Sequence, residues 1–370
     1  MKVLLTGATG FLGKYVLNLL LADPRVTQVV IPTRVRRTHP NEKVTIVQLD
    51  LTDIAQVEAF EFDGDAVIHL AGLYDFSRTM PDNYSQNVVN MLNMIALLER
   101  LNQTKRVPVY YASSYSVGLG YGKVLDESPL ERVPPKQSQY AFTKAIAEKL
   151  LTDSFVPAFV FRLGILVGSE TDGEILKTDG PYEFLKQLIL ISKLPGSRHL
   201  RRIPIPSDRK GLLPLVPVNQ AAEVFHQALF HPELQTEWQK IFGVYNTDSL
   251  GIAEFCEIAV PRFLKNARPH FIEKLPSLQI PLLALPAVNL IKSRLLRFGA
   301  LQRNVEAFRF ALDPVKLSNG SFVRYFGKKR ISNFRDYQEV FFRGFSDYLL
   351  DQVDEEARAA GKIQAQGKRP

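Results

Sequence analysis

The sequence predicts an α/β fold in which a doubly wound parallel sheet is followed by a smaller C-terminal lobe. Up to Gly168, short segments rich in Val, Ile and Leu alternate with segments whose apolar residues recur at helical spacing. A glycine-rich turn follows the first apolar segment, and beyond Gly168 the alternation gives way to irregular stretches. Strands that alternate with helices form parallel sheets with helices on both faces, which is the doubly wound arrangement.

The first element is a strand, turn and helix with the sequence KVLLTGATGFLG, from Lys2 to Gly13. In such a turn Gly7 permits the sharp exit from the strand, and Gly10 lets backbone N–H groups approach a pyrophosphate. Gly13 lets the helix pack closely on the strand, and the helix N-terminus favours the negative phosphates. The turn therefore predicts a Rossmann-type dinucleotide site with these cofactor-binding residues: Gly7, Gly10, Phe11, Leu12 and Gly13.

Five further strands are predicted, at Val26–Arg34, Thr45–Asp50, Asp65–Gly72, Arg106–Ser114 and Phe159–Gly168. Apolar spacing predicts a long helix over Asn83–Asn102 and another over Tyr140–Leu151. Because ligands bind at the carboxyl ends of parallel strands, the residues just after each strand are the candidates for function. Asp53 or Thr52 is expected to cap a helix, and His69, inside an apolar strand, is expected to be a satisfied core residue.

The end of the second strand indicates which dinucleotide is bound. Where NAD-binding proteins place an acidic residue on the ribose 2′-hydroxyl, this chain has Thr33 and Arg34, followed by Arg36 and Arg37. A guanidinium suits a 2′-phosphate, so Arg34 favours NADP, with NAD as the alternative cofactor. A solvated basic loop is the structural interpretation of the same residues.

Tyr140 and Lys144 are four residues apart on a predicted helix, so their side chains lie on one face about one turn apart. A phenol is a poor acid–base group at neutral pH, but a neighbouring ammonium favours the phenolate. Ser114, at the end of a strand, could place its hydroxyl near that phenol and polarise a carbonyl between them. These three residues are the predicted catalytic group, and Lys144 could also hydrogen-bond a cofactor ribose.

The YxxxK spacing alone is weak evidence, because the sequence contains it three times. The other two instances begin at Tyr182 and Tyr325, which lie in a helical pattern and in a turn rich in Gly and Lys. Neither follows a strand that ends in two serines, as the instance at Tyr140 does. Tyr182 and Tyr325 are therefore expected to be structural or solvated.

Six segments, GATGFLG, LDLTD, HLAG, YASSYSVG, YAFTK and FRLGILVG, occur in the order and approximate spacing of extended short-chain dehydrogenases/reductases. The chain thus resembles the NAD-dependent epimerase/dehydratase family over roughly residues 1 to 230, since Pro214–Leu229 also resembles the family's returning segment. The resemblance implies an NAD(P)-dependent oxidoreductase in which Tyr140 is the general acid or base and Lys144 orients the ribose.

The same resemblance implies roles for four further residues. Asp50 and Leu51 would border the adenine, and Ala71 would lie near the ribose and phosphates of the cofactor. Asn87, in the predicted long helix, resembles an asparagine of the family. Asn219 departs from the family, because many relatives carry an aspartate there.

The loop after the fifth strand reads SVGLGYG, without the tyrosine that sugar-nucleotide enzymes of the family carry directly after the valine. With the basic strand end, this resembles the reductase branches: dihydroflavonol-reductase-like, hydroxysteroid-dehydrogenase-like and fatty acyl thioester reductases. The leading expectation is hydride transfer between NADP(H) and a carbonyl, hydroxyl or thioester carbon of an apolar, lipid-like substrate. The alternatives are an NAD-dependent sugar-nucleotide epimerase or dehydratase, and a non-catalytic NADP-binding sensor or assembly protein.

The composition of the 370 residues, with 46% hydrophobic and 23% charged, is ordinary for a soluble globular protein. The net charge of +8 permits an anionic partner, but the basic residues are dispersed and no nucleic-acid partner is expected. A single cysteine, Cys256, excludes an internal disulfide. The His and Cys residues do not cluster in the sequence, so no metal site is expected. The first strand begins at Lys2, which leaves no room for a signal or transit peptide, so a cytoplasmic location is expected.

The predicted organisation has an NAD(P)-binding Rossmann domain at residues 1–168, to which residues 214–248 return. Residues 169–213 and 249–350 form the predicted substrate-binding lobe, and 351–370 a flexible tail. These boundaries follow from the point at which the strand and helix alternation stops.

Two segments of the second half leave alternatives open. Pro276–Gln302 is apolar, is interrupted by prolines and ends in an amphipathic pattern. It could line a lipophilic pocket, contact a membrane surface peripherally or form ordinary core. The basic stretch Gly196–Gly211 is interpreted as a solvated face, with a phosphate site for the substrate as the alternative. The resemblance also implies a homodimer.

Overall fold

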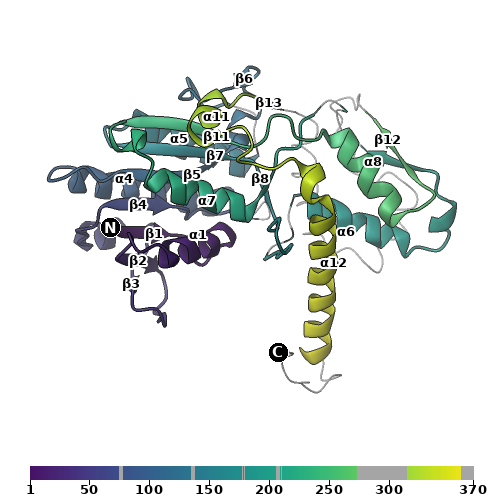
Figure 1. Ribbon diagram of the computed structural model, residues 1–370, viewed down its shortest axis with the longest axis horizontal. Helices are drawn as coiled ribbons and strands as arrows, with labels where there is room; N and C mark the ends of the chain where they lie inside the picture. Colours follow the sequence, from purple (N-terminus) through teal and green to yellow (C-terminus); the bar gives the residue numbers. More distant parts are fainter. Residues whose placement is uncertain are drawn as a thin grey trace.

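The computed structural model describes residues 1–74, 78–134, 138–176, 178, 180–205, 209, 211–272 and 315–359. A parallel sheet with helices on both faces forms the larger body, and a smaller lobe lies beside it (Figure 1). The long C-terminal helix starts between the two parts and projects away from them (Figure 1).

The sheet has seven strands in the order β3-β2-β1-β4-β5-β7-β11, and all neighbouring pairs are parallel. Their bounds are β1 Lys2–Thr6, β2 Gln28–Thr33, β3 Val44–Gln48, β4 Ala66–His69, β5 Val109–Ser114, β7 Ala158–Leu163 and β11 Gln239–Val244. The strand order reverses between β1 and β4, and ligands bind at the carboxyl ends next to such a point. The α/β doubly wound parallel sheet predicted from the sequence is thus confirmed.

Helices cover both faces of this sheet because successive strand residues point to opposite sides and both sides are apolar. The covering helices are α1 Phe11–Ala22 and α7 Val218–Leu229 on one face, and α2 Ile54–Ala59, α4 Asn90–Leu101 and α5 Gln139–Asp153 on the other. In β1, for example, Val3 and Leu5 join the core under α1 and α7, while Leu4 joins the opposite core. The sheet therefore has no solvent-exposed face in its centre.

The helix predicted over Asn83–Asn102 consists of three consecutive segments. Helix α3 (Met80–Tyr84) leads into a π-helical turn, η1 (Ser85–Val89), and then into α4. A π-helical turn inserts one extra residue into a helix and often occurs at functional sites. Here it carries Asn87 toward the end of β4.

The strand predicted over Phe159–Gly168 is two strands that belong to different sheets. Strand β7 ends at Leu163, and β8 (Ile165–Val167) pairs instead with β10 (Leu215–Pro217). The break falls at Gly164, where a Cβ would lie 2.3 Å from the carbonyl oxygen of Pro214. Position 164 therefore requires a glycine. The break at this residue redirects the chain from the large sheet into the lobe.

The lobe is formed by helices and short strands around a core of its own. They are α6 Pro181–Ser192, β9 Arg202–Ile205, α8 Ile252–Phe263, β12 Arg268–Phe271 and α12 Phe334–Ala359. Helix α12 continues nine residues beyond Leu350, so the tail predicted at 351–370 begins as helix. The segment Pro276–Gln302, predicted to line a pocket, contact a membrane or form ordinary core, lies outside the described residues.

One segment assigned to the lobe from the sequence packs on the larger body instead. Helix α11 (Gly320–Phe326) lies against β11, and Phe322 and Tyr325 are part of the core under α1 and α7. Tyr325 is therefore structural, as expected, although it lies in a helix rather than a turn. The carboxylate of Glu127 accepts the N–H of Phe322 at 2.8 Å and so fixes the start of this helix.

Two structural interpretations from the sequence are confirmed. The Asp53 carboxylate caps α2 by accepting the backbone N–H groups of Ala55 and Gln56 at 3.0 and 3.3 Å. His69 is 2% exposed, and its Nδ1 lies 2.8 Å from the hydroxyl of Thr6. Burial lowers the pKa of His69 to about 3, with the nearby Lys144 contributing, so this imidazole is neutral.

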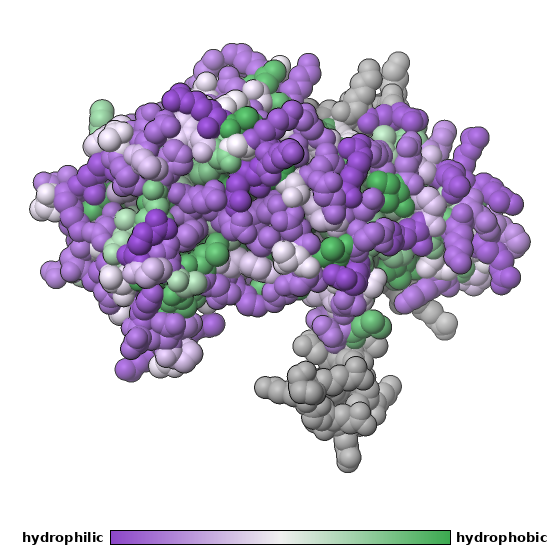
Figure 2. All heavy atoms as spheres, in the orientation of Figure 1, coloured by the Kyte–Doolittle hydropathy of each residue, from purple (hydrophilic) through white to green (hydrophobic). Residues whose placement is uncertain are grey.

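The visible surface is mostly hydrophilic, with small separate apolar patches (Figure 2). Within the part of the chain that the structure describes, no helix combines the length and apolar character needed to cross a bilayer.

A buried ion pair joins α5 to β7. Glu148 and Arg162 have fully buried side chains, and one oxygen of Glu148 lies 2.5 Å from Nη2 and 3.0 Å from Nε of Arg162. The other oxygen of Glu148 accepts a hydrogen bond from the hydroxyl of Ser113 on β5 at 2.5 Å. Because charged groups are costly to bury alone, this triad requires α5 to sit in one position on the sheet.

Replacing Arg162 by Met should leave the Glu148 carboxylate buried without its cation. We expect the free energy of unfolding to fall by about 3–5 kcal/mol, the usual loss when one partner of a buried pair is removed. Urea denaturation followed by circular dichroism measures the loss. Arg324→Met is the control, because the Arg324–Glu233 pair is exposed and its removal should leave stability near that of the wild type. Equal effects of the two substitutions would contradict this account.

Candidate active site

The glycine turn between β1 and α1 has the geometry of an anion cradle. Gly7 has a φ of +70°, and a Cβ there would lie 2.7 Å from the backbone nitrogen of Ala71. A Cβ on Gly13 would lie 2.0 Å from the carbonyl oxygen of Gly7. Gly10 precedes α1 and has no side chain to cap it, and within the described parts of the chain no other side chain accepts from the first N–H groups of this helix. The turn fits a pyrophosphate because it offers uncapped amides at a positive helix end.

The turn opens into a pocket of about 540 Å³. Five of the predicted cofactor-binding residues line it, namely Gly7, Gly10, Phe11, Leu12 and Gly13. The predicted catalytic residues Ser114, Tyr140 and Lys144 line the same pocket. Residues predicted from two distant parts of the sequence are thus brought to one cavity, at the carboxyl ends of β1 and β5.

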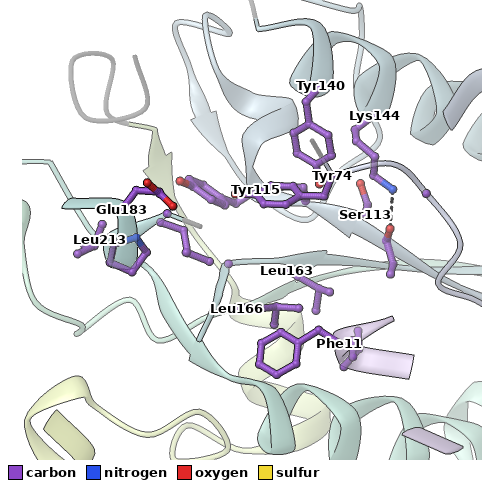
Figure 3. A pocket seen from close by; sticks show the side chains of 18 of the residues that line it. Phe11, Tyr74, Ser113, Tyr115, Tyr140, Lys144, Leu163, Leu166, Glu183 and Leu213 are labelled. Carbon is purple, nitrogen blue, oxygen red and sulfur yellow. Dashed lines mark hydrogen bonds between the residues drawn. The ribbon is translucent and has the colours of Figure 1, made fainter. Parts of the chain in front are cut away.

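Tyr140 and Lys144 enter the pocket from α5, opposite Phe11, Leu163 and Leu166 (Figure 3). Ser138 caps α5 by accepting the N–H of Ala141 at 3.2 Å, which starts the helix just before Tyr140. The Tyr140 ring also packs edge-on against Tyr74, with ring centroids 4.8 Å apart.

Lys144 is almost fully buried, and its amine donates hydrogen bonds to two protein acceptors. Its Nζ donates to the hydroxyl of Tyr111 at 2.6 Å and to the carbonyl oxygen of Ala112 at 2.7 Å. Burial lowers the pKa of Lys144 to about 7, and the Glu148 carboxylate one turn further along α5 partly offsets this effect. The amine therefore exchanges protons near neutral pH, where a catalytic group is most useful.

Ser114 is the last residue of β5, and 8% of its surface is exposed. Its oxygen accepts the N–H of Ser116 at 3.2 Å and so caps the short 3₁₀ helix η2 (Tyr115–Gly118). Because that oxygen is an acceptor in this contact, the hydroxyl proton remains available as a donor. The adjacent Ser113 instead bonds Glu148, so the two serines have different tasks.

Asn87 connects the loop after β4 with α5. Its side-chain oxygen accepts the N–H of Leu73 at 2.8 Å, and its Nδ2 donates to the hydroxyl of Thr143 at 3.1 Å. Asn87 is 4% exposed, and a Cβ on Gly72 would lie 3.1 Å from its oxygen. The asparagine that resembled a family residue therefore orders the pocket wall.

Four predicted cofactor contacts lie outside the pocket lining. Arg34 is exposed at the end of β2. Asp50 uses one carboxylate oxygen to accept the N–H and the hydroxyl of Thr52, at 2.9 and 2.8 Å. Leu51 is buried in the core under α4, and the N–H of Ala71 donates to the hydroxyl of Thr6 at 3.1 Å. Their contacts with a cofactor stay predictions.

The outer part of the pocket is apolar and comes mainly from the lobe. Its lining includes Leu166, Phe184, Leu213, Ile252, Phe255 and Cys256. Burial raises the pKa of the Cys256 thiol to about 12, so the thiol is unreactive at neutral pH. Glu183 and Gln187 of α6 add polar groups, and Glu183 lies at the end of the pocket away from Lys144 (Figure 3).

Sequence reasoning missed this outer lining. The one available signal was the helical spacing of Glu183 and Gln187, which places both on one face of α6. Among the described residues, no group of three or more His, Cys, Asp or Glu side chains is arranged to hold a metal ion.

Comparison with known proteins identifies relatives for much of the chain. Residues 3–242 match the NAD dependent epimerase/dehydratase family. The hybrid PKS-NRPS synthetase poxE of Penicillium oxalicum is 28% identical over 238 residues, which cover 60% of this chain and 5% of the synthetase. The synthetase xenE of Xenoacremonium sinensis is 30% identical over 239 residues, or 60% of this chain and 6% of the synthetase. The chain thus spans a small fraction of these curated relatives.

Solved structures share the fold. The terminal R domain of the myxalamid PKS-NRPS pathway aligns with a TM-score of 0.71 at 18% identity, covering 94% of this chain and 90% of that one. WbmH of Bordetella bronchiseptica, in complex with NAD+, gives 0.61 at 17% identity over 92% of this chain and 98% of its own. MoeE5, in complex with UDP-glucuronic acid and NAD, gives 0.60 at 16% identity over 94% and 100%.

Gly13→Ala should damage the cradle directly. The added methyl group would overlap the carbonyl oxygen of Gly7. Because this oxygen belongs to the backbone, it cannot move aside as the end of a flexible side chain could. We expect the affinity for NADPH to fall at least tenfold and the free energy of unfolding to fall by about 1–3 kcal/mol, as in other overpacked sites. Fluorescence titration with NADPH and urea denaturation measure these effects. Gly320→Ala is the control, because nothing lies within 4 Å of a Cβ there. A Gly13→Ala protein that binds NADPH normally would contradict the role of the glycine turn in cofactor binding.

Proposed function

The chain belongs to the NAD-dependent epimerase/dehydratase family, and from that premise we propose that it is an NADPH-dependent reductase of an apolar carbonyl or thioester compound. The family and the fold make it an NAD(P)-dependent oxidoreductase of the short-chain dehydrogenase/reductase type. The observation that carries the finer proposal is the continuous pocket. It joins the glycine turn and the group of Tyr140 and Lys144 to an apolar chamber in the lobe.

The chain's own residues supply the proton transfer and the binding. When bound, NADPH supplies a hydride to the substrate carbon. In the proposed mechanism, the Tyr140 hydroxyl gives its proton to the substrate oxygen, and the Ser114 hydroxyl donates a hydrogen bond to that oxygen. The ammonium form of Lys144 stabilises the phenolate that Tyr140 becomes. The buried surroundings of these groups limit access of water, which strengthens each of these interactions.

The charges of the pocket argue against a nucleotide-sugar substrate. Among the described residues that line it, Lys144 is the one cationic side chain, and it is bound to Tyr111 and Ala112. A nucleoside diphosphate sugar would bring two negative charges into an outer chamber where, among the described residues, the charged side chain is the acidic Glu183. Burying a phosphate without cations is costly. An uncharged apolar substrate suits the same chamber.

The relatives suggest how such a substrate would be presented. The myxalamid neighbour is a terminal R domain, and the curated relatives are PKS-NRPS synthetases. An acyl chain in thioester linkage is apolar and has a carbon that hydride can reduce. We therefore include a thioester among the proposed substrates, besides aldehydes and ketones.

Tyr140→Phe tests the proton transfer. The variant keeps the ring but has no proton to give, so turnover of a long-chain aldehyde with NADPH should fall about 10²–10⁴-fold. Binding of NADPH should be nearly unchanged, because the substitution leaves the glycine turn intact. Absorbance at the NADPH band measures turnover, and fluorescence measures binding. Tyr182→Phe, in the structural YxxxK instance, is the control, and undiminished turnover in Tyr140→Phe would exclude the mechanism.

Arg34→Ala tests the cofactor preference. Losing a guanidinium beside the 2′-phosphate should weaken NADPH binding about 10–100-fold, the worth of one charge-assisted contact, and leave NADH binding unchanged. Isothermal titration with both cofactors measures the difference. The neighbouring exposed Arg37, replaced by Ala, serves as the control. A chain that retains NAD through purification and never consumes NADPH would instead support the epimerase or dehydratase alternative.

A further inference from the structure

Strand β5 places consecutive side chains on opposite faces of the sheet, so its two adjacent tyrosines have different surroundings. Tyr110 lies in the core under α1 and α7, where its ring centroid is 5.2 Å from that of Phe159. Tyr111 lies on the side of α5, and 2% of its surface is exposed. The mechanism proposed above gives Tyr111 no task.

Tyr111 is held from two directions. Its ring stacks on His69 of β4, with centroids 5.6 Å apart and planes at 23°. Its hydroxyl lies 2.6 Å from Nζ of Lys144, and its ring centroid lies 4.2 Å from the same atom. The ring is thus anchored to the sheet, and its hydroxyl offers a fixed partner to a lysine on the facing helix.

A buried amine that titrates needs a partner for each protonation state. The ammonium form of Lys144 donates to the Tyr111 hydroxyl and to the carbonyl of Ala112. The neutral form has a lone pair, which a carbonyl cannot fill but a hydroxyl can, since a hydroxyl both accepts and donates. A carboxylate at position 111 would hold the lysine as ammonium, and a phenylalanine would leave Ala112 as its one acceptor from β5.

The protonation behaviour of Lys144 and Tyr111 suits a hydrogen bond in which the hydroxyl accepts from the charged amine and donates to the neutral one. Burial lowers the pKa of Lys144 to about 7, so both of its forms are populated near neutral pH. Burial, with the nearby Glu148 and Tyr140, raises the pKa of Tyr111 well above its ordinary value, so this hydroxyl keeps its proton. Tyr111 therefore remains able to donate throughout the range in which Lys144 changes charge.

We propose that Tyr111 is a positioning residue of this enzyme: its hydroxyl holds the Lys144 amine at the pocket in both protonation states. The proposal rests on the proposed function of Lys144, and it adds a residue that acts through that lysine. Tyr111 is not among the described residues that line the pocket, so it touches neither substrate nor cofactor there. Without its hydroxyl, the buried amine loses an acceptor for its charged form.

Other titratable groups also face Lys144, and the Tyr111→Phe substitution leaves each of them in place. Tyr140 and Glu148 lie one turn before and after it on α5, and Glu148 is paired with Arg162. From the sheet, His69 is neutral because burial lowers its pKa to about 3. Replacing Tyr111 by Phe should therefore remove one hydrogen-bond partner of the amine and none of these neighbouring groups.

The first measurement is a direct titration of Lys144 in the full chain. Lysine labelled with carbon-13 at Cε gives one resonance per lysine, and Lys144→Arg assigns the resonance of interest. In Tyr111→Phe both forms of Lys144 lose a partner, but the hydrogen bond to the charged amine is the stronger of the two. We therefore expect the midpoint of Lys144 to move to lower pH. Tyr110→Phe, on the opposite face of the same strand, should keep the wild-type midpoint.

The second measurement is the pH profile of kcat/KM for NADPH-dependent reduction of a long-chain aldehyde. The alkaline loss of activity should start at lower pH in Tyr111→Phe, with kcat/KM about tenfold lower at neutral pH, the usual effect of one hydrogen bond to a charged group. Tyr110→Phe should follow the wild-type profile.

An unchanged Lys144 midpoint in Tyr111→Phe overturns the proposal even if activity falls, because the ring would then act by packing alone. Tyr111→Met, which also lacks the hydroxyl, gives the same readout if the first variant folds poorly. If the wild type oxidises no NADPH with any substrate, the proposed function fails. The titration, which needs no substrate, still decides the role of Tyr111.

Discussion

The site depends on the close approach of the glycine turn to the end of β4. Thr6, the last residue of β1, is fully buried, and its hydroxyl accepts the N–H of Ala71 and contacts His69. Gly7 follows at once and has no space for a Cβ against the same Ala71 nitrogen. These contacts join the two central strands at the point where the strand order reverses. Because the glycine turn and the pocket wall share this junction, a shift of either would move both.

The site also depends on a polar face of α5, which fixes the position of this helix on the sheet. Tyr140, Lys144 and Glu148 follow one another at four-residue intervals, so they face the sheet together. Lys144 bonds to β5 through Tyr111, and Glu148 bonds to β5 through Ser113 and to β7 through Arg162. Apolar packing alone tolerates small rotations of a helix, but these directional bonds do not. They fix the rotation of α5 and thereby the place at which the Tyr140 ring enters the pocket.

The parts of the site that are local in sequence could be predicted, and the others could not. A glycine turn or a pair four residues apart is specified within one or two elements. Gly7, Gly13, Tyr140 and Lys144 were therefore predicted from their spacing and from the strands and helices next to them, and they do line one pocket. The Tyr111–Lys144 bond joins a strand to a helix 33 residues later, and adjacent tyrosines do not reveal which faces which side. The break at Gly164 and the return of α11 to β11 likewise depend on distant contacts. The outer pocket lining comes from a lobe with weak periodicity, so its residues gave no comparable signal.

The lobe completes the pocket because it is fixed to α1, the helix that follows the glycine turn, as well as to the sheet. Glu174, in the loop after β8, accepts hydrogen bonds from Lys14 and Tyr15 of α1 at 2.7 and 2.8 Å. The preceding Gly173, at a φ of +79°, packs against Gly344 of α12, where a Cβ on Gly344 would lie 2.0 Å from its carbonyl oxygen. One loop thus touches the first helix of the body and the last helix of the lobe. Since the lobe forms the apolar chamber and α1 follows the glycine turn, this loop sets the distance between the chamber and the turn.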